Sequence, residues 1–141
     1  MAHPVSVRFQ DPRVADEMKA EARAAGMSAS ALAEQLIVEG LRMRRHPRVI
    51  FRSGPAGRRP GLVDGPDIWE IIGGLVGGDV PAEQRIDRAV AEFGLRRGQV
   101  EAALAYYAEF TDEIDSWIRH NNEYAARAEA LWRREQELLA R

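Results

Sequence analysis

The stretch that decides the fold reads Val5-Ser6-Val7-Arg8-Phe9-Gln10. Apolar and polar residues alternate strictly, so the apolar side chains share one face of an extended strand and the polar ones share the other. Pro12 follows directly and ends the strand pattern. A single strand with no second strand beside it leaves a row of backbone N–H and C=O groups unpaired. The stretch therefore predicts pairing with another chain.

Two helices are expected after this strand. Apolar residues at helical spacing predict one helix from Arg13 to Ala25 and another from Ser28 to Arg44, with Gly26 between them. About 40 residues without cysteine are too few for a self-sufficient core. We therefore expect a homodimer in which the strands pair antiparallel above four helices. The residues expected in its core are Val14, Met18, Ala22, Ala25, Leu32, Leu36, Ile37, Gly40 and Leu41.

This strand and its two helices resemble a ribbon-helix-helix repressor domain. A two-stranded ribbon fits the major groove of operator DNA, where Arg8 could read guanine and Gln10 adenine. The start of the second helix could hold a DNA phosphate. The predicted DNA contacts of this domain are Ser6, Arg8, Gln10, Ser28 and Ser30. The alternative is that the polar face of the strand is only the solvated side of a dimerisation strand.

The next segment is rich in arginine. Seven arginines lie between Arg42 and Arg59, and no acidic residue occurs between Glu39 and Asp64. We expect Arg44 and Arg45 to contact DNA phosphates, although the run could also be a solvated linker. Pro47 marks the boundary between two modules. The strand-like residues Val49–Phe51 and Arg59–Val63, with Gly54-Pro55-Ala56-Gly57 between them, predict a β-hairpin.

The second module is expected to be a small helical domain. A buried helix begins near Ile68, a second helix follows Pro81 and ends at Gly94, and a third begins after Leu95. This order is typical of a helix-turn-helix. The residues at the start of its recognition helix would be Arg96, Arg97 and Gln99, which we predict to contact DNA. The alternative is a three-helix unit that does not touch DNA.

A long amphipathic helix is predicted from Thr111 to Leu139, because this range contains no proline or glycine and its apolar residues form a single stripe. At about 1.5 Å per residue the helix is longer than a small module needs, so its distal turns should overhang. We expect the stripe to bind a partner protein, the alternative being packing across the dimer. The predicted partner contacts are Trp117, Ile118, Leu131, Trp132 and Leu138.

Several segments of the second half resemble one bacterial family. They are His46-Pro47-Arg48-Val49-Ile50-Phe51-Arg52, Gly57-Arg58-Arg59, Ala102-Ala103-Leu104-Ala105-Tyr106-Tyr107 and Asp112-Glu113-Ile114-Asp115. The family is the domain of unknown function 433, found in antitoxins of the VapB type that are paired with PIN-like ribonuclease toxins. The resemblance runs from His46 to Ile118. It implies an antitoxin that neutralises such a toxin and represses its own operon.

The sequence gives no sign of enzymatic chemistry. There is no cysteine, and the three histidines lie far apart without partners at metal-ligand spacing, so we expect no enzyme, no cofactor and no metal. The net charge is −2, so a basic surface would have to be local. No apolar run approaches the length of a membrane span and no signal-peptide core is present. We expect a cytoplasmic protein that does not contact a membrane.

The expected architecture is mainly α and has three parts. Residues 1–45 form the ribbon-helix-helix domain, residues 46–110 a winged or helix-turn-helix-like domain with a short hairpin, and residues 111–141 the C-terminal helix. The leading functional hypothesis is an antitoxin of a type II toxin–antitoxin system. The alternative is a stand-alone transcriptional regulator whose C-terminal region only mediates oligomerisation.

Overall fold

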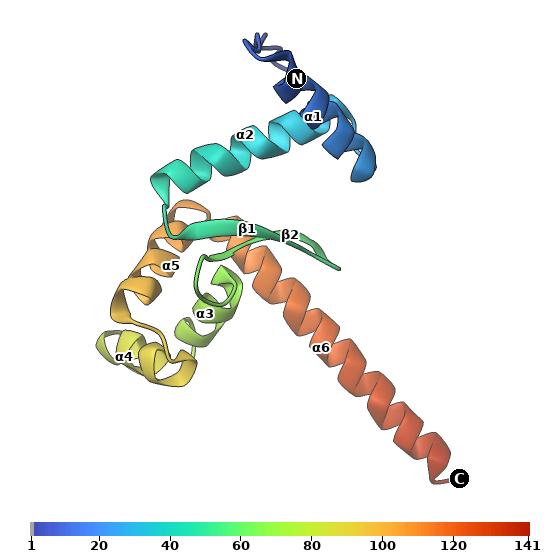
Figure 1. Cartoon of the computed structure of the whole chain (residues 1–141). Coiled ribbons are helices and arrows are strands. Elements are labelled where there is room, and N and C mark those ends of the chain that lie inside the picture. Colours follow the sequence, from blue (N-terminus) through green and yellow to red (C-terminus); the bar gives the residue numbers. More distant parts are fainter. Residues whose placement is uncertain (1) are drawn as a thin grey trace. The chain divides into compact units, whose positions relative to one another are not determined.

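The computed structural model describes residues 2–141, and these residues form six helices and one two-stranded hairpin (Figure 1). The mainly helical class predicted from the sequence is confirmed. The elements are α1 (Pro12–Ala24), α2 (Ala29–Arg45), β1 (Val49–Gly54), β2 (Gly57–Leu62), α3 (Ile68–Leu75), α4 (Ala82–Phe93), α5 (Arg97–Glu109) and α6 (Thr111–Leu139). The chain divides into two compact units, which we call unit 1 (Met1–Arg44) and unit 2 (Arg45–Arg141).

Local side-chain contacts set the helix starts in unit 1. The Asp11 carboxylate caps α1 by accepting a hydrogen bond from the backbone N–H of Arg13 at 3.0 Å. Bonds from Arg13 hold the pKa of Asp11 below its ordinary value. Gly26, at φ 66°, turns the chain between the helices. The Ser28 hydroxyl then accepts from the N–H of Ala31 at 3.1 Å, which confirms the predicted capping role of Ser28.

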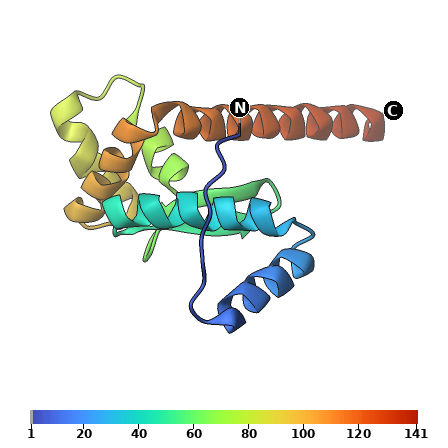
Figure 2. The same cartoon turned by 90° about the horizontal axis from the view of Figure 1, so that it is seen from above.

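The predicted N-terminal strand is not formed in the single chain. Residues 2–9 adopt neither helix nor strand, and Figure 2 shows them as a coil that leads into α1. Val5 and Val7 are 85% and 63% exposed. A strand needs hydrogen-bonding partners on a neighbouring strand, and one chain offers none here. Pairing with a second copy stays a prediction.

Most of the core expected for unit 1 is open in the single chain. Ala22 and Leu32 are buried as predicted, but five of the other expected core residues are exposed: Val14, Ala25, Leu36, Ile37 and Leu41. One copy alone leaves these five positions open, and their burial against a second copy stays a prediction. The physical reason is size, because two helices side by side cannot enclose their own apolar faces.

In unit 2 the predicted hairpin is confirmed. Strands β1 and β2 pair antiparallel from Val49 opposite Leu62 to Gly54 opposite Gly57, so only two residues form the turn. Gly57 has a φ of 114°, which a side chain would strain. An isolated bridge between Gly61 and Asp67 then ties the end of the hairpin to the start of α3.

The core of unit 2 lies between the hairpin and helices α3, α4, α5 and the first turns of α6. Its buried residues are Val49, Leu62, Ile68, Ile71, Ile72, Leu75, Ala89, Leu95, Val100, Ala103, Tyr106 and Ile114. Helix α3 contributes four of them, which confirms the prediction of a central buried helix. Gly94, at φ 64°, ends α4 where the sequence predicted it. The chain can then turn directly into α5.

Only the beginning of α6 belongs to this core. Ile114 is fully buried, Trp117 and Ile118 are half-buried, and every residue from Arg119 to Arg141 is exposed. Figure 1 shows the helix continuing well past the other elements of unit 2. The predicted overhang of the distal turns is therefore confirmed. Among residues 2–141, no helix combines the length and the apolar character that a bilayer crossing requires.

Candidate functional site

The residues predicted to read DNA bases are accessible. Ser6, Arg8 and Gln10 are exposed on the N-terminal segment, and Ser30 is exposed near the start of α2. The Ser28 hydroxyl already accepts the Ala31 N–H, so this serine is occupied as a helix cap. In the single chain these side chains have no fixed arrangement relative to a groove, because the strand that would align them is unpaired.

The two arginines at the end of α2 differ in their surroundings. Arg44 is exposed. The guanidinium of Arg45 pairs with the Glu109 carboxylate at 2.9 Å and lies 5.9 Å from the centre of the Phe110 ring. The other Glu109 oxygen lies 2.6 Å from His46 Nε2. A phosphate contact by Arg45 would therefore compete with an ion pair inside unit 2.

The arginines at the start of α5 are exposed but already paired. Arg96 Nη2 lies 2.9 Å from Asp64 Oδ2. The Arg97 guanidinium pairs with Asp87 at 3.2 Å and with Glu101 at 3.1 Å. The surface expected to face DNA therefore carries acids next to its arginines. Their contact with DNA stays a prediction.

Gln99 has a structural role that the sequence prediction missed. Its side chain accepts the backbone N–H of Arg96 at 2.8 Å and donates to Asp64 Oδ1 at 2.9 Å. Gln99 is only 4% exposed, so its amide cannot reach a base edge from this position, and the predicted DNA contact is corrected. The bond from Gln99, followed by that from Arg96, lowers the pKa of Asp64. Together these bonds hold the loop after β2 against the start of α5.

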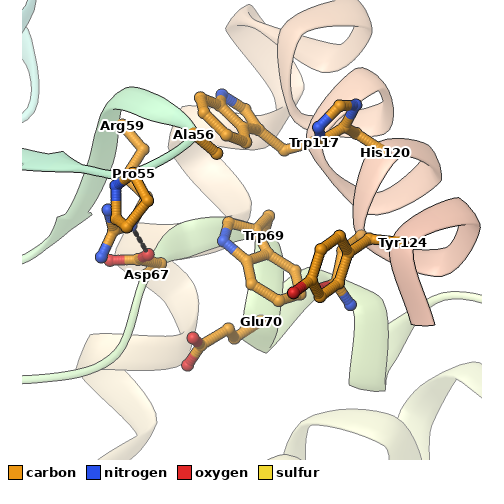
Figure 3. Close-up of a pocket in the computed structure, with 10 residues that line it drawn as sticks. Pro55, Ala56, Arg59, Asp67, Trp69, Glu70, Trp117, His120 and Tyr124 are labelled. Carbon is orange, nitrogen blue, oxygen red and sulfur yellow. Dashed lines mark hydrogen bonds and ion pairs between the residues drawn. The ribbon is translucent and has the colours of Figure 1, made fainter. Parts of the chain in front are cut away.

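Unit 2 also contains a pocket of about 540 Å³, which we call the aromatic pocket. It lies between the hairpin turn, the start of α3 and the middle of α6. Its lining residues are Pro55, Ala56, Arg59, Asp67, Trp69, Glu70, Trp117, His120, Asn121 and Tyr124. Figure 3 shows the Trp117 ring on one side, Trp69 and Tyr124 on the other, and the two carboxylates at the edge. The volume lies within the range of small-ligand sites.

The two carboxylates of this pocket differ in their surroundings. Asp67 is buried and pairs with Arg52 at 3.2 Å and with Arg59. The structure of residues 2–141 shows no hydrogen bond or ion pair at the Glu70 carboxylate. Partial burial and the nearby Asp67 charge raise the pKa of Glu70, against a smaller opposite effect of the two arginines. The pocket therefore has one acid that is held in ion pairs and one, which we call uncompensated, that has no ion pair within residues 2–141.

The residues predicted to bind a partner fall into two groups. Trp117 lines the aromatic pocket, and Ile118 packs against the core of unit 2. Leu131, Trp132 and Leu138 are exposed on the overhanging turns. The sequence predicts all five as partner contacts on one apolar stripe. The structure instead leaves three of them free for a partner, with Trp117 partly accessible through the pocket.

Comparison with protein-family models, with curated proteins and with solved structures found no match to this chain. The resemblances described above therefore rest on the quoted residues alone. Within residues 2–141, no three or more His, Cys, Asp or Glu side chains are grouped so that they could hold a metal ion.

Proposed function

We propose that this chain is the antitoxin of a type II toxin–antitoxin system, which dimerises through unit 1, represses its own operon and neutralises a PIN-like ribonuclease toxin. The observation that carries the proposal is the open apolar surface of unit 1. Val5, Val7 and Phe9 are exposed on one side of an alternating segment, and Leu36, Ile37 and Leu41 are exposed on α2.

Antiparallel pairing with a second copy would satisfy the unpaired backbone groups of the N-terminal segment and cover the exposed apolar side chains of unit 1. It would give the backbone groups of residues 5–10 hydrogen-bonding partners. It would also cover the apolar side chains with those of two further helices, which is worth roughly 25 cal/mol for each Å² removed from water. The opposite face of the same ribbon would then carry Ser6, Arg8 and Gln10 from each copy, related by the two-fold symmetry that a palindromic operator shares.

The toxin-binding part of the proposal rests on α6. Trp132 is 57% exposed, and Leu131 and Leu138 are exposed beside it, on turns that touch no other element of unit 2. Large apolar side chains grouped on an exposed helix commonly anchor a partner. Many proteins recognise a partner's helix in this way, with its apolar face in a groove.

A second candidate is a stand-alone regulator in which α6 only mediates oligomerisation. Trp117, Tyr124, Leu131 and Leu138 follow one another at seven-residue steps, which is the repeat of a helix seam between copies. Deletion of residues 123–141 separates the two candidates. An antitoxin loses binding to the toxin encoded beside it and remains a dimer, whereas a regulator of the second kind loses a higher oligomeric state.

The dimer and DNA proposals are tested with two substitutions on opposite faces of residues 5–10. Val7→Asp should give a monomer in sedimentation experiments and abolish DNA binding, because a carboxylate cannot be buried in the dimer core. Ser6→Asp, its matched control on the polar face, should remain a dimer and weaken DNA binding by charge repulsion. A Val7→Asp protein that is still a dimer would refute the ribbon.

A further inference from the structure

The aromatic pocket joins three aromatic rings to an uncompensated carboxylate. We propose that it binds the guanidinium group of an arginine side chain from a partner protein. This inference deepens the proposed partner-binding role of α6, on which it rests for the source of the arginine. Its chemistry follows from the rings, the charge and the position of the pocket.

The rings provide stacking surfaces. Trp69 comes from α3, and Trp117 and Tyr124 come from α6. Figure 3 shows an open space between the Trp117 ring and the pair formed by Trp69 and Tyr124. The face of an indole attracts a cation, and a guanidinium is planar and weakly hydrated, so it stacks on such a face more readily than an ammonium group. An arginine is therefore favoured over a lysine.

The charge at the edge of the pocket favours a cation. Ion pairs with Arg52 and Arg59 compensate the negative charge of Asp67. Glu70 is not engaged by any such pair in residues 2–141, and its pKa is raised because it is partly withdrawn from water close to Asp67. A guanidinium beside Glu70 would supply the missing countercharge and present two N–H donors to one carboxylate. Arg59 also lines the pocket but is held by Asp67, so the Glu70 carboxylate favours a fork-shaped cation.

The position of the pocket points to a protein as the source of the cation. Trp117 and Tyr124 are followed at seven-residue steps by Leu131 and Leu138, and all four side chains lie along one face of α6. The last three of these side chains are exposed. A partner that covers this apolar face would pass over the mouth of the pocket, so one of its side chains can enter. The partner should therefore present an arginine next to an apolar surface.

The test uses the full chain with Trp132→Phe, so that Trp69 and Trp117 alone report by fluorescence. It is titrated with a seven-residue peptide of leucine and alanine around one central arginine, and with the same peptide carrying citrulline. Citrulline has nearly the same shape and no charge. We expect the arginine peptide to bind roughly tenfold more tightly, measured by tryptophan emission and by calorimetry.

A matched pair of variants locates the contact. Glu70→Gln should weaken the arginine peptide about fivefold or more, since it removes the uncompensated charge. The matched control, Glu123→Gln, removes a carboxylate of α6 that lies near the pocket in sequence but does not line it. The affinity of this variant for the arginine peptide should be unchanged. Glu70 does not belong to the buried core of unit 2, so its substitution leaves that core intact. Circular dichroism of both variants checks that they are folded.

Three results would overturn the inference: no response to the arginine peptide at 10 mM, equal binding of the citrulline peptide, or unchanged affinity in Glu70→Gln. Self-association of the chain that buries Trp117 would also overturn it, because the occupant would be a second copy. The peptide test requires neither DNA nor toxin, so its failure leaves the dimer and operator proposals standing. Failure of toxin binding alone would leave the arginine site intact and place its partner elsewhere.

Discussion

Removal of the distal part of α6 should leave the fold of unit 2 almost unchanged. A chain that ends after Asn122 loses only side chains that are exposed, among them Leu131 and Trp132. Surface changes of this kind usually alter the free energy of unfolding by about 0.5 kcal/mol. Since 1 kcal/mol corresponds to roughly 4–8 °C in a domain of 60–100 residues, the Tm should fall by less than about 4 °C.

A single substitution in the first turns of the same helix should cost far more. Ile114 is fully buried in the core of unit 2, and Ile114→Ala removes most of its side chain and leaves a cavity. Such substitutions cost about 2–5 kcal/mol, so the Tm should fall by roughly 10 °C or more. The contrast between a truncation of nineteen residues and one core substitution tests where α6 is held.

The assay is thermal unfolding at a fixed protein concentration, because dimerisation makes the Tm depend on concentration. Circular dichroism at 222 nm follows the helices, and the emission of Trp69 and Trp117 follows unit 2, with Trp132→Phe as the full-length reference. Two results would contradict this expectation: a truncated chain that is unfolded at room temperature, or a fall in its Tm as large as that of Ile114→Ala. Either result would mean that the distal turns pack against the fold.

Three further predictions follow from individual side chains. Arg8→Ala should weaken operator binding by about 1–3 kcal/mol and relax the preference at one base pair, whereas Arg44→Ala should weaken binding to all DNA sequences alike and flatten its salt dependence. Fluorescence anisotropy with operator DNA and with random DNA compares the two variants. If Arg8→Ala loses as much affinity for random DNA as for the operator, Arg8 does not read a base. Asp67→Asn should lower the free energy of unfolding in urea by about 3 kcal/mol, because it leaves two partly buried arginines without their anion; a loss below 1 kcal/mol contradicts this. Asp64 has a pKa below its ordinary value of 3.8, so its bonds stabilise the fold above that pH and are lost as the pH falls through the lowered pKa. The Tm difference between the wild type and Asp64→Asn should accordingly shrink between about pH 6 and pH 2, and a constant difference would exclude this linkage.

The elements of secondary structure could be predicted from the sequence because their signals are local. Gly26 and Gly94 adopt the positive φ angles that end α1 and α4, and the Ser28 hydroxyl caps α2 within three residues of its own position. The hairpin could be predicted for the same reason, since its two strands are separated by a turn of only two residues. In each case the atoms that interact are neighbours along the chain, so composition and spacing carry the information.

The burial of the Gln99 side chain depends on a contact with a residue far away in the sequence, which the spacing of residues along the helix does not reveal. The sequence placed it at the exposed start of a recognition helix, and the start of α5 was predicted correctly. Its amide turned inward because Asp64, thirty-five residues earlier, lies within 2.9 Å once β2 and α5 have packed together. A buried amide with a hydrogen-bonding partner is more stable than one left in an apolar environment, so the Gln99 side chain stays inside and bonds to Asp64 at the surface.

The sequence by itself determined the helices, the hairpin, the buried character of α3 and the length of α6. Only the tertiary structure decided which parts of these elements meet. The aromatic pocket brings Trp69 of α3 and Tyr124 of α6 together with the turn at Pro55, and it leaves Trp132 of the same apolar stripe in water. A helical stripe specifies a face that must be covered, but the covering surface is fixed by how far the core extends beneath it. In this chain the core ends near Ile118, and the remaining turns of α6 stay exposed.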